Sequence, residues 1–378
     1  NRFIAAARRD IGQVLAATSL VVIFAFFSIM RPVFHEWQNI SNILMSTTVT
    51  GLLALGVTFV IITGGIDLSI GTPVDPSPQA MQAALASHGN APGYPLTIGS
   101  AALRESLHRW ITTKFFPSGS IDFLPTIGSK ELVGLLPTFL QAKKVLIPEI
   151  AYPTYHVGAL VAGAECIAVN DDYESWPTDA DHVWINSPAN PHGRVLSEEQ
   201  LRGIIKWARA TQTLVASDEC YFELGWESQP QSLLQVADGD CSGLLIVHSL
   251  SKSFNAAGYR AAFIAGDPLV IGKIREIRKH LGLIMPAPIQ HAMRSALDEP
   301  TDIALQKERY RKRRELLRDA LDSAGFTISH SEAGLYLWAT RGEECWQSVA
   351  WAAERGILIT PGIFYGDKGA HHVRIALT

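Results

Sequence analysis

The feature that most constrains this chain is a change in character near residue 71. No charged residue occurs from Ile11 to Met30, which is about 20 positions and long enough to cross a bilayer as one helix. A second uncharged run extends from Ile43 to Ile66. Arg2, Arg8 and Arg9 precede the first run, so the positive-inside rule places the N-terminus in the cytoplasm. We expect two membrane-spanning helices in residues 11–66, with a pair of buried core helices as the alternative.

Beyond residue 71 the sequence takes on the pattern of an α/β protein. Short apolar stretches alternate with helix-like ones such as residues 197–211. The expected strands are KVLIP (144–148), HVWIN (182–186), TLVAS (213–217), LLIVH (244–248) and AAFIAG (261–266). Strands that are apolar almost throughout are typical of a mostly parallel sheet with helices on both faces. Ligands of such a sheet bind at the carboxyl ends of its strands, so the candidate site lies there.

Charge and cysteine content narrow the class of partner. The 378 residues carry a net charge of -4, which provides no basic surface for nucleic acid. The four cysteines have neither C-x-x-C nor histidine-rich spacing, so they indicate neither a zinc site nor a disulfide framework. We therefore expect small-molecule substrates, no metal and no nucleic acid, in a reducing compartment.

One lysine stands directly after an expected strand, in HSLSKSFNAAGYR. Lys252 follows residues 244–248 and is flanked by serines, so its amine would be partly desolvated and able to act as a nucleophile. Arg260, eight residues later, could return to the same anion as Ser249. The alternative for Lys252 is a surface lysine in a polar loop.

Two further polar residues follow other expected strands. Asp218 comes after residues 213–217 in ASDECYFELGW, with Tyr221 three positions later. Asn190 lies among turn prolines in NSPANPHG. Asp218 could instead cap a helix, and Asn190 could belong to an ordinary turn.

In this order and spacing, these residues resemble the type I fold of pyridoxal-phosphate-dependent aminotransferases, over residues 67–378. The resemblance implies an α/β fold with a large, mostly parallel-sheet domain (72–284) and a small C-terminal α+β domain (285–378). It also implies pyridoxal 5′-phosphate as cofactor. Lys252 would form an imine with the cofactor's aldehyde, and Asp218 would keep the ring nitrogen protonated, so that the ring accepts electrons.

The same resemblance assigns the remaining cofactor contacts. Tyr221 and Asn190 match residues that donate hydrogen bonds to the ring's phenolate oxygen, and Tyr152 in IPEIAYPTY matches the aromatic that stacks on the ring. The phosphate would lie at a helix N-terminus. The residues that would hold this phosphate are Gly128, Ser129, Lys130, Ser249 and Arg260.

Substrate and partner contacts follow by resemblance as well. Arg374 in HHVRIALT matches the arginine that binds the substrate α-carboxylate by a two-point contact, with Asn190 and Gly71 beside it. An exposed C-terminal arginine is the alternative. Tyr94 in GYPLTIG matches a tyrosine that reaches the phosphate of a neighbouring subunit, which implies a homodimer.

Longer stretches of sequence resemble one subgroup of these aminotransferases. LSIGTPVDP, GLIMPAPIQHAM, EAGLYLWAT and GIFYGDKGAHHVRIALT are similar to actinobacterial-type N-succinyldiaminopimelate aminotransferases of lysine biosynthesis. This implies amino transfer between N-succinyl-LL-2,6-diaminopimelate and 2-oxoglutarate, with Lys252 moving the proton at the α-carbon. The alternatives are another type I fold enzyme, either a different transaminase or a C–S lyase, or a non-functional chimera.

The chimera alternative arises from the N-terminal 71 residues. NISNILMSTTVTGLLALGVTFVIITGGIDLSIG resembles the membrane segments of ribose-type sugar ABC transporter permeases. A transport subunit would need further spans after residue 71, where no uncharged run approaches 18 residues. A regulator of the same fold would need a DNA-binding helix-turn-helix before it. We therefore expect an enzyme whose catalytic part faces the cytoplasm, tethered to the inner membrane through residues 11–66.

Overall fold

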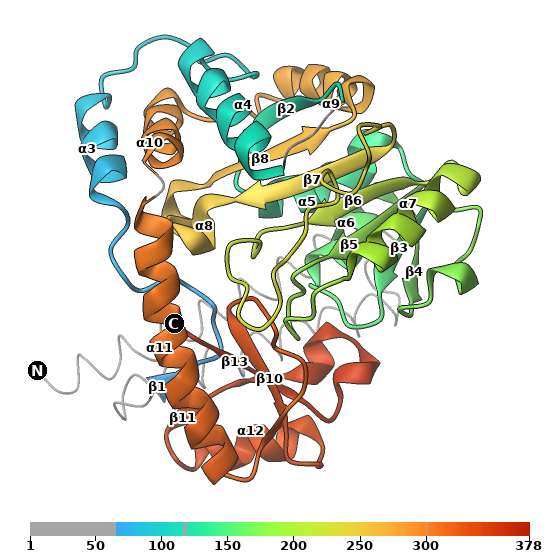
Figure 1. Cartoon of the computed structure of the whole chain (residues 1–378), viewed down its shortest axis with the longest axis vertical. Coiled ribbons are helices and arrows are strands. Elements are labelled where there is room, and N and C mark those ends of the chain that lie inside the picture. The colour runs from blue at the N-terminus through green and yellow to red at the C-terminus, as the bar shows by residue number, and fades with distance from the viewer. Residues whose placement is uncertain (1–65, 116–118, 300) are drawn as a thin grey trace, which may run out of the picture. The chain divides into compact units, whose positions relative to one another are not determined.

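The computed structural model describes residues 66–115, 119–299 and 301–378 (Figure 1). Except for Ile66, the two apolar runs expected to span a membrane lie outside these residues, as does most of the permease-like stretch. Within the described residues no helix combines the length and apolarity needed to cross a bilayer. Ile66 and Asp67 form a short strand, β1 (Ile66–Asp67), which pairs in parallel with β11 (Ile357–Leu358).

A seven-stranded sheet organises most of the described chain, in the order β2-β8-β7-β6-β5-β3-β4 (Figure 1). The five strands from β7 to β4 run parallel, while β8 is antiparallel to both of its neighbours. The expected mostly parallel sheet is therefore confirmed. Its strands are β2 (Asp122–Ile127), β3 (Lys144–Pro148), β4 (Glu165–Val169), β5 (His182–Asn186), β6 (Leu214–Asp218), β7 (Leu244–Ser249) and β8 (Ala261–Gly266).

Three expected strands have the bounds of β3, β5 and β8, and two differ by one residue. β6 ends at Asp218 rather than before it, because Asp218 continues the parallel ladder opposite Val247. β7 likewise includes Ser249, which pairs with Ala262 of β8. Both polar residues are thus held by the sheet rather than by a loop, which fixes their side chains more firmly at its carboxyl edge.

Helices cover both faces of the sheet and form two separate apolar cores. One core includes Leu107 and Trp110 of α4, Ile204 of α7 and Met293 of α10. The other includes Leu136 of α5. The helices flanking this sheet are α3 (Gln79–Ser87), α4 (Ala101–Phe115), α5 (Ser129–Leu140), α6 (Thr154–Ala162), α7 (Glu198–Thr211), α8 (Leu250–Ser253), α9 (Pro268–His280) and α10 (Ala287–Asp298).

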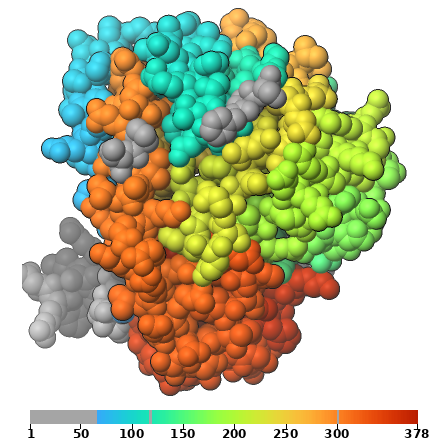
Figure 2. Space-filling view, viewed as in Figure 1, coloured from blue at the N-terminus to red at the C-terminus, as the bar shows by residue number. Residues whose placement is uncertain are grey.

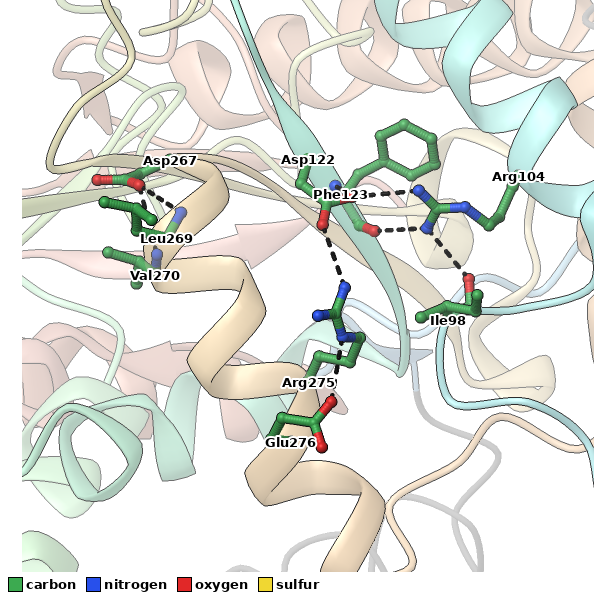
Figure 3. Close-up of polar contacts among 9 residues, drawn as sticks. All are labelled: Ile98, Arg104, Asp122, Phe123, Asp267, Leu269, Val270, Arg275 and Glu276. Atoms are coloured by element: carbon green, nitrogen blue, oxygen red, sulfur yellow. Dashed lines mark hydrogen bonds and ion pairs between the residues drawn. The ribbon is translucent and has the colours of Figure 1, made fainter.

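Local sequence signals explain where these helices begin. α7 starts at a capping box, in which the side chains of Ser197 and Gln200 each accept a backbone N–H. Asp267 caps α9 by accepting the N–H of Leu269 at 2.8 Å (Figure 3). Figure 3 also shows Asp122 of the edge strand β2 between Arg104 and Arg275, at 3.2 and 3.6 Å. These pairs join β2 to α4 and α9.

A second, four-stranded antiparallel sheet lies in the C-terminal part of the chain, in the order β12-β13-β10-β9. The C-terminal residues gather at one end of the face shown in Figure 2. Arg374 lies on β13, opposite Trp338 of β10. The elements are α11 (Thr301–Ser323), β9 (Thr327–Ile328), β10 (Tyr336–Thr340), α12 (Cys345–Ala353), β12 (Thr360–Pro361) and β13 (Val373–Ala376).

Candidate active site

A cavity of about 330 Å³ opens at the carboxyl ends of β5, β6 and β7, where the sequence predicts the site. All the predicted site residues line it except Gly128 and Tyr94. Its lining consists of Ile70, Gly71, Thr72, Ser129, Lys130, Tyr152, Asn190, Asp218, Cys220, Tyr221, Ser249, Ser251, Lys252, Ala257, Arg260, Tyr336 and Arg374.

Lys252 lies on the short helix α8, immediately after the buried strand β7. It is not the surface lysine of the alternative interpretation, because its amine points into the cavity and donates a hydrogen bond to the carbonyl oxygen of Gly71. Burial lowers the pKa of Lys252 below its usual value, although the neighbouring Tyr336 opposes this shift. A larger share of the amine is therefore neutral near pH 7 and available as a nucleophile or base.

Asp218 is 6% exposed and presents its carboxylate to the cavity. One oxygen, Oδ2, accepts the hydroxyl of Tyr155 at 2.9 Å, and Oδ1 accepts the backbone N–H of Cys220 at 3.2 Å. The residues that follow Asp218 form a turn rather than a helix, so the second bond caps a turn and Asp218 is not the helix cap of the alternative interpretation. Burial raises the pKa of Asp218, while the two hydrogen bonds oppose that rise. A cationic group in the cavity would relieve the cost of this buried charge.

The N-terminus of α5 meets Arg260 at one end of the cavity. Gly128 precedes the helix with φ 72°, and a Cβ added there would lie 2.2 Å from Nη2 of Arg260. Glycine is needed on both counts, because a side chain would strain the backbone and displace the guanidinium. Ser129 begins the helix, and Ser249 hydrogen-bonds Ser251 at 2.8 Å beside it. Backbone N–H groups, hydroxyls and a guanidinium at one helix N-terminus suit a phosphate.

Arg374 is 8% exposed and points inward from β13, so the alternative of an exposed C-terminal arginine is wrong. Its two Nη atoms donate to Oδ1 of Asn190 at 3.1 Å and to the carbonyl of Ser69 at 2.6 Å. The guanidinium carbon lies 4.0 Å above the ring of Tyr336 and 5.0 Å from that of Tyr365. Its buried Nε–H has no acceptor among the described residues. This orphaned donor suits a carboxylate ligand.

Sequence reasoning missed two hydroxyl groups of the site. Tyr155 donates to Asp218 from within α6. Tyr336, at the start of β10, lies 3.2 Å from Tyr221, hydroxyl oxygen to hydroxyl oxygen. Tyr155 follows Tyr152 by three positions, and the two rings meet edge to face at 5.8 Å, so their closeness in the sequence was an available signal. Tyr336 stands in the apolar run LYLWA, where nothing separates it from a core aromatic.

The other predicted residues are placed as follows. Tyr152 lines the cavity, and the amine of Lys130 lies 5.7 Å from the centre of its ring. Tyr94 is 100% exposed and does not line this chain's cavity. Its predicted contact with a neighbouring subunit therefore stays a prediction.

The donor set of the cavity fits pyridoxal phosphate. An amine (Lys252), a buried carboxylate (Asp218) and an aromatic ring (Tyr152) line the same cavity as the anion-binding end at Arg260. These groups match an aldehyde, a ring nitrogen, a ring face and a phosphate respectively.

Comparison with known proteins agrees with this chemistry. The sequence profile of the family described as aminotransferase class I and II matches residues 63–378. The chain belongs to this family. Aminotransferases of class I and II depend on pyridoxal phosphate, act on amino acids and oxo acids, and are typically dimers.

Individual aminotransferases extend the comparison. The chain is 50% identical to a "probable aminotransferase" of Mycobacterium tuberculosis, covering 83% of this chain and 77% of that protein. It is 46% identical to the 4-dedimethylamino-4-oxo-anhydrotetracycline transaminase OxyQ of Streptomyces rimosus, and the alignment covers 83% of this chain and 89% of that protein. The solved structure of N-succinyldiaminopimelate aminotransferase from Mycobacterium tuberculosis superposes on this chain with a TM-score of 0.78 and 25% sequence identity, covering 86% of this chain and 92% of that one.

The aminotransferase match includes residues 63–71, the end of the stretch that also resembles a permease. In the structure, residues from Ile66 onward belong to one compact unit that extends to Thr378. Ser69 accepts from Arg374, and Gly71 accepts from Lys252. Ser69, Ile70 and Gly71 of the GGIDLSIG ending therefore contribute to the candidate site.

Proposed function

We propose that this aminotransferase transfers an amino group between N-succinyl-LL-2,6-diaminopimelate and 2-oxoglutarate. The observation that carries amino transfer is the pairing, in one cavity, of a buried reactive amine (Lys252) with an inward arginine (Arg374) whose Nε–H lacks an acceptor. The narrower substrate is supported by the sequence stretches similar to N-succinyldiaminopimelate aminotransferases and by the solved relative of that name.

The cofactor would be held by residues already placed in the cavity. Ser129, Ser249 and Arg260 would bind its phosphate, and Tyr152 would contact its ring. When bound, pyridoxal phosphate supplies a protonated ring that accepts the electron pair left when the substrate's α-proton departs. The negative charge of Asp218 would keep the ring nitrogen protonated, and Tyr155 holds the Asp218 carboxylate in place by its hydrogen bond.

Lys252 and Arg374 divide the work on the substrate. Arg374 binds the α-carboxylate through its guanidinium, which Asn190 and the Ser69 carbonyl hold in place. The Lys252 amine, whose pKa burial lowers, would accept the proton from the substrate's α-carbon and return it to C4′ of the cofactor. The Gly71 carbonyl hydrogen-bonds this amine and directs it toward the cavity.

A second candidate substrate follows from the relative with 46% identity, whose name specifies an oxo-anhydrotetracycline. The amino acceptor named for that relative is a ring ketone rather than an amino acid derivative, so this acceptor has no α-carboxylate for Arg374 to bind. A different amino acid transaminase and a C–S lyase of the same fold remain further alternatives, since both would keep Lys252 and Asp218. We also propose a homodimer in which Tyr94 reaches the neighbouring subunit's phosphate.

Steady-state kinetics test the substrate assignment. We expect kcat/KM for N-succinyl-LL-2,6-diaminopimelate, with 2-oxoglutarate as acceptor, to exceed that for unsuccinylated diaminopimelate by at least about 10²-fold, because a site that hydrogen-bonds a substrate group can reject the analogue lacking it by about 10⁴- to 10⁵-fold. Arg374→Lys should weaken the binding of substrates that carry an α-carboxylate, because a single ammonium group cannot make the two-point contact. Equal kcat/KM for both diaminopimelates, or pyruvate formation from cysteine conjugates, would contradict the proposal.

A further inference from the structure

Tyr336 brings a second phenol hydroxyl to the edge of the cofactor cavity. It is the first residue of β10, is buried, and lines the cavity. Its hydroxyl oxygen lies 3.2 Å from that of Tyr221, and the two rings meet edge to face at 5.8 Å. Tyr221 lies in the turn that follows β6 of the large sheet, and Tyr336 lies on β10 of the small sheet, so only the folded chain brings them together.

Close packing fixes the position of the Tyr336 phenol. The guanidinium carbon of Arg374 lies 4.0 Å from the ring centre. Gly71 approaches so closely that a Cβ there would lie 2.2 Å from the Tyr336 hydroxyl oxygen. The hydroxyl therefore has little freedom to turn to another partner, and Tyr221 is its only side-chain hydrogen-bond partner among the described residues.

The number of protons decides what this contact can do. Each phenol has one O–H to donate, so a single hydrogen bond between two hydroxyls leaves one proton free. If Tyr336 donates, the Tyr221 proton is free to point into the cavity. If Tyr221 donates, its proton is used up, and it can only accept from a ligand.

The proposed role of Tyr221 decides between these two directions. If Tyr221 donates its proton to the ring oxygen of the cofactor, only Tyr336 has a proton left for the bond between the two hydroxyls. The guanidinium of Arg374, 4.0 Å from the centre of the Tyr336 ring, favours the same direction, because its charge lowers the pKa of Tyr336 against the effect of burial. The other groups that face Tyr336 are Lys252 on α8, Tyr310 on α11 and Tyr365.

We propose that Tyr336 is a positioning residue that donates its proton to the Tyr221 hydroxyl and thereby directs the Tyr221 O–H at the ring oxygen of the bound cofactor. The inference rests on the proposed role of Tyr221 as a donor to that oxygen. A chain of two hydroxyls also strengthens the second bond, because each donor polarises the next. Tyr336 would then help to keep the cofactor's titrating group in its deprotonated form near neutral pH.

Tyr336→Phe tests this while preserving the ring beneath Arg374. The readout is the pH midpoint of the absorbance change of the bound cofactor, measured without substrate. Loss of the donated bond weakens stabilisation of the negatively charged ring oxygen, so the midpoint should rise by roughly 0.3 to 1 unit. Tyr365→Phe is the matched control, because Tyr365 also faces Arg374, at 5.0 Å, but makes no hydrogen bond to Tyr221. Its midpoint should equal that of the unmodified enzyme.

The background variant Tyr221→Phe separates a relay from a direct effect. If Tyr336 acts through Tyr221, Tyr336→Phe should add no further shift to that variant. An unchanged midpoint in Tyr336→Phe, a full additional shift in the double variant, or an equal shift in the Tyr365 control would each overturn the inference. Failure of the proposed function is distinct, because it would appear as absent turnover of N-succinyl-LL-2,6-diaminopimelate by the unmodified enzyme, whereas the pH midpoint is measured without substrate.

Discussion

Replacing Asp218 with Asn isolates the contribution of one buried negative charge. Asn has the same shape and retains an oxygen that can accept the N–H of Cys220, which is 3.2 Å from the carboxylate in the structure. It cannot, however, hold a proton on the cofactor's ring nitrogen. The variant therefore removes charge while leaving the local packing of β6 in place.

The size of the effect follows from the burial of the site. Two unit charges about 4 Å apart interact by about 4 kcal/mol at an effective dielectric constant of 20. Asp218 is 6% exposed, so water screens this attraction little. About 4 kcal/mol corresponds to about 10³-fold in rate. We expect kcat for amino transfer to fall by roughly 10²- to 10³-fold, as for other preorganised charges in active sites.

Folding should not account for that loss. Because burial raises the pKa of Asp218, the folded pKa lies above the unfolded one, and the ionised carboxylate lowers stability at pH values above the unfolded pKa. The neutral amide removes this cost. The cofactor-free Asn variant should thus melt at the same temperature as the unmodified protein or higher, when calorimetry is performed near pH 7.

Single-turnover kinetics with glutamate, monitored by cofactor absorbance, measure the step directly. Tyr155→Phe is the matched control, because it removes the 2.9 Å hydrogen bond to Asp218 but keeps the charge, and it should cost roughly 10-fold. If the Asn variant turned over within a few-fold of the unmodified enzyme, Asp218 would be only a turn-capping residue, and the electrostatic reasoning would be refuted.

Two further variants probe other parts of the site, and a third probes an ion pair outside it. Lys252→Ala should lower turnover by at least about 10³-fold while still binding pyridoxal phosphate, and borohydride reduction of the unmodified enzyme should label Lys252 in peptide maps rather than another lysine. Gly128→Ala should weaken cofactor binding about 10-fold or more in absorbance titrations, because the added Cβ would displace Arg260. An unchanged affinity would show that Gly128 does not belong to the phosphate site. The hydrogen bond from Arg313, at 2.6 Å, lowers the pKa of Asp75, so the pair stabilises the fold at pH values above the unfolded pKa of Asp75, and this stabilisation is lost as the pH falls. Asp75→Asn should therefore lower the melting temperature at pH 7 but not near pH 2. An equal loss at both pH values would contradict the role of the ion pair.

The sequence predicted strand bounds and site residues best where a local pattern of residues is enough to define them. Apolar runs bounded by turn residues predicted β3, β5 and β8 with their observed bounds. Because the parallel strands end at one edge, polar residues that follow them in the sequence were expected to meet, and Lys252 and Asp218 line one cavity.

The contacts that sequence reasoning missed depend on tertiary packing. Tyr336 and Tyr155 occupy apolar stretches, so their ring character predicts core packing and conceals the hydroxyl that reaches the site. Ser69 and Gly71 act through backbone carbonyls, which no side-chain pattern reveals. The direction of Arg374 could be inferred from its strand-like setting, but its bond to Asn190 joins residues 184 positions apart.

The half-reaction with glutamate tests the central claim most directly. Purified protein loaded with pyridoxal phosphate should lose its visible absorbance band and gain a near-ultraviolet band when glutamate is added, with one equivalent of 2-oxoglutarate formed per site. Addition of 2-oxoglutarate should reverse the change. A loaded enzyme whose spectrum stays constant with glutamate and with N-succinyl-LL-2,6-diaminopimelate, or which releases ammonia instead of retaining the amino group, would contradict the account.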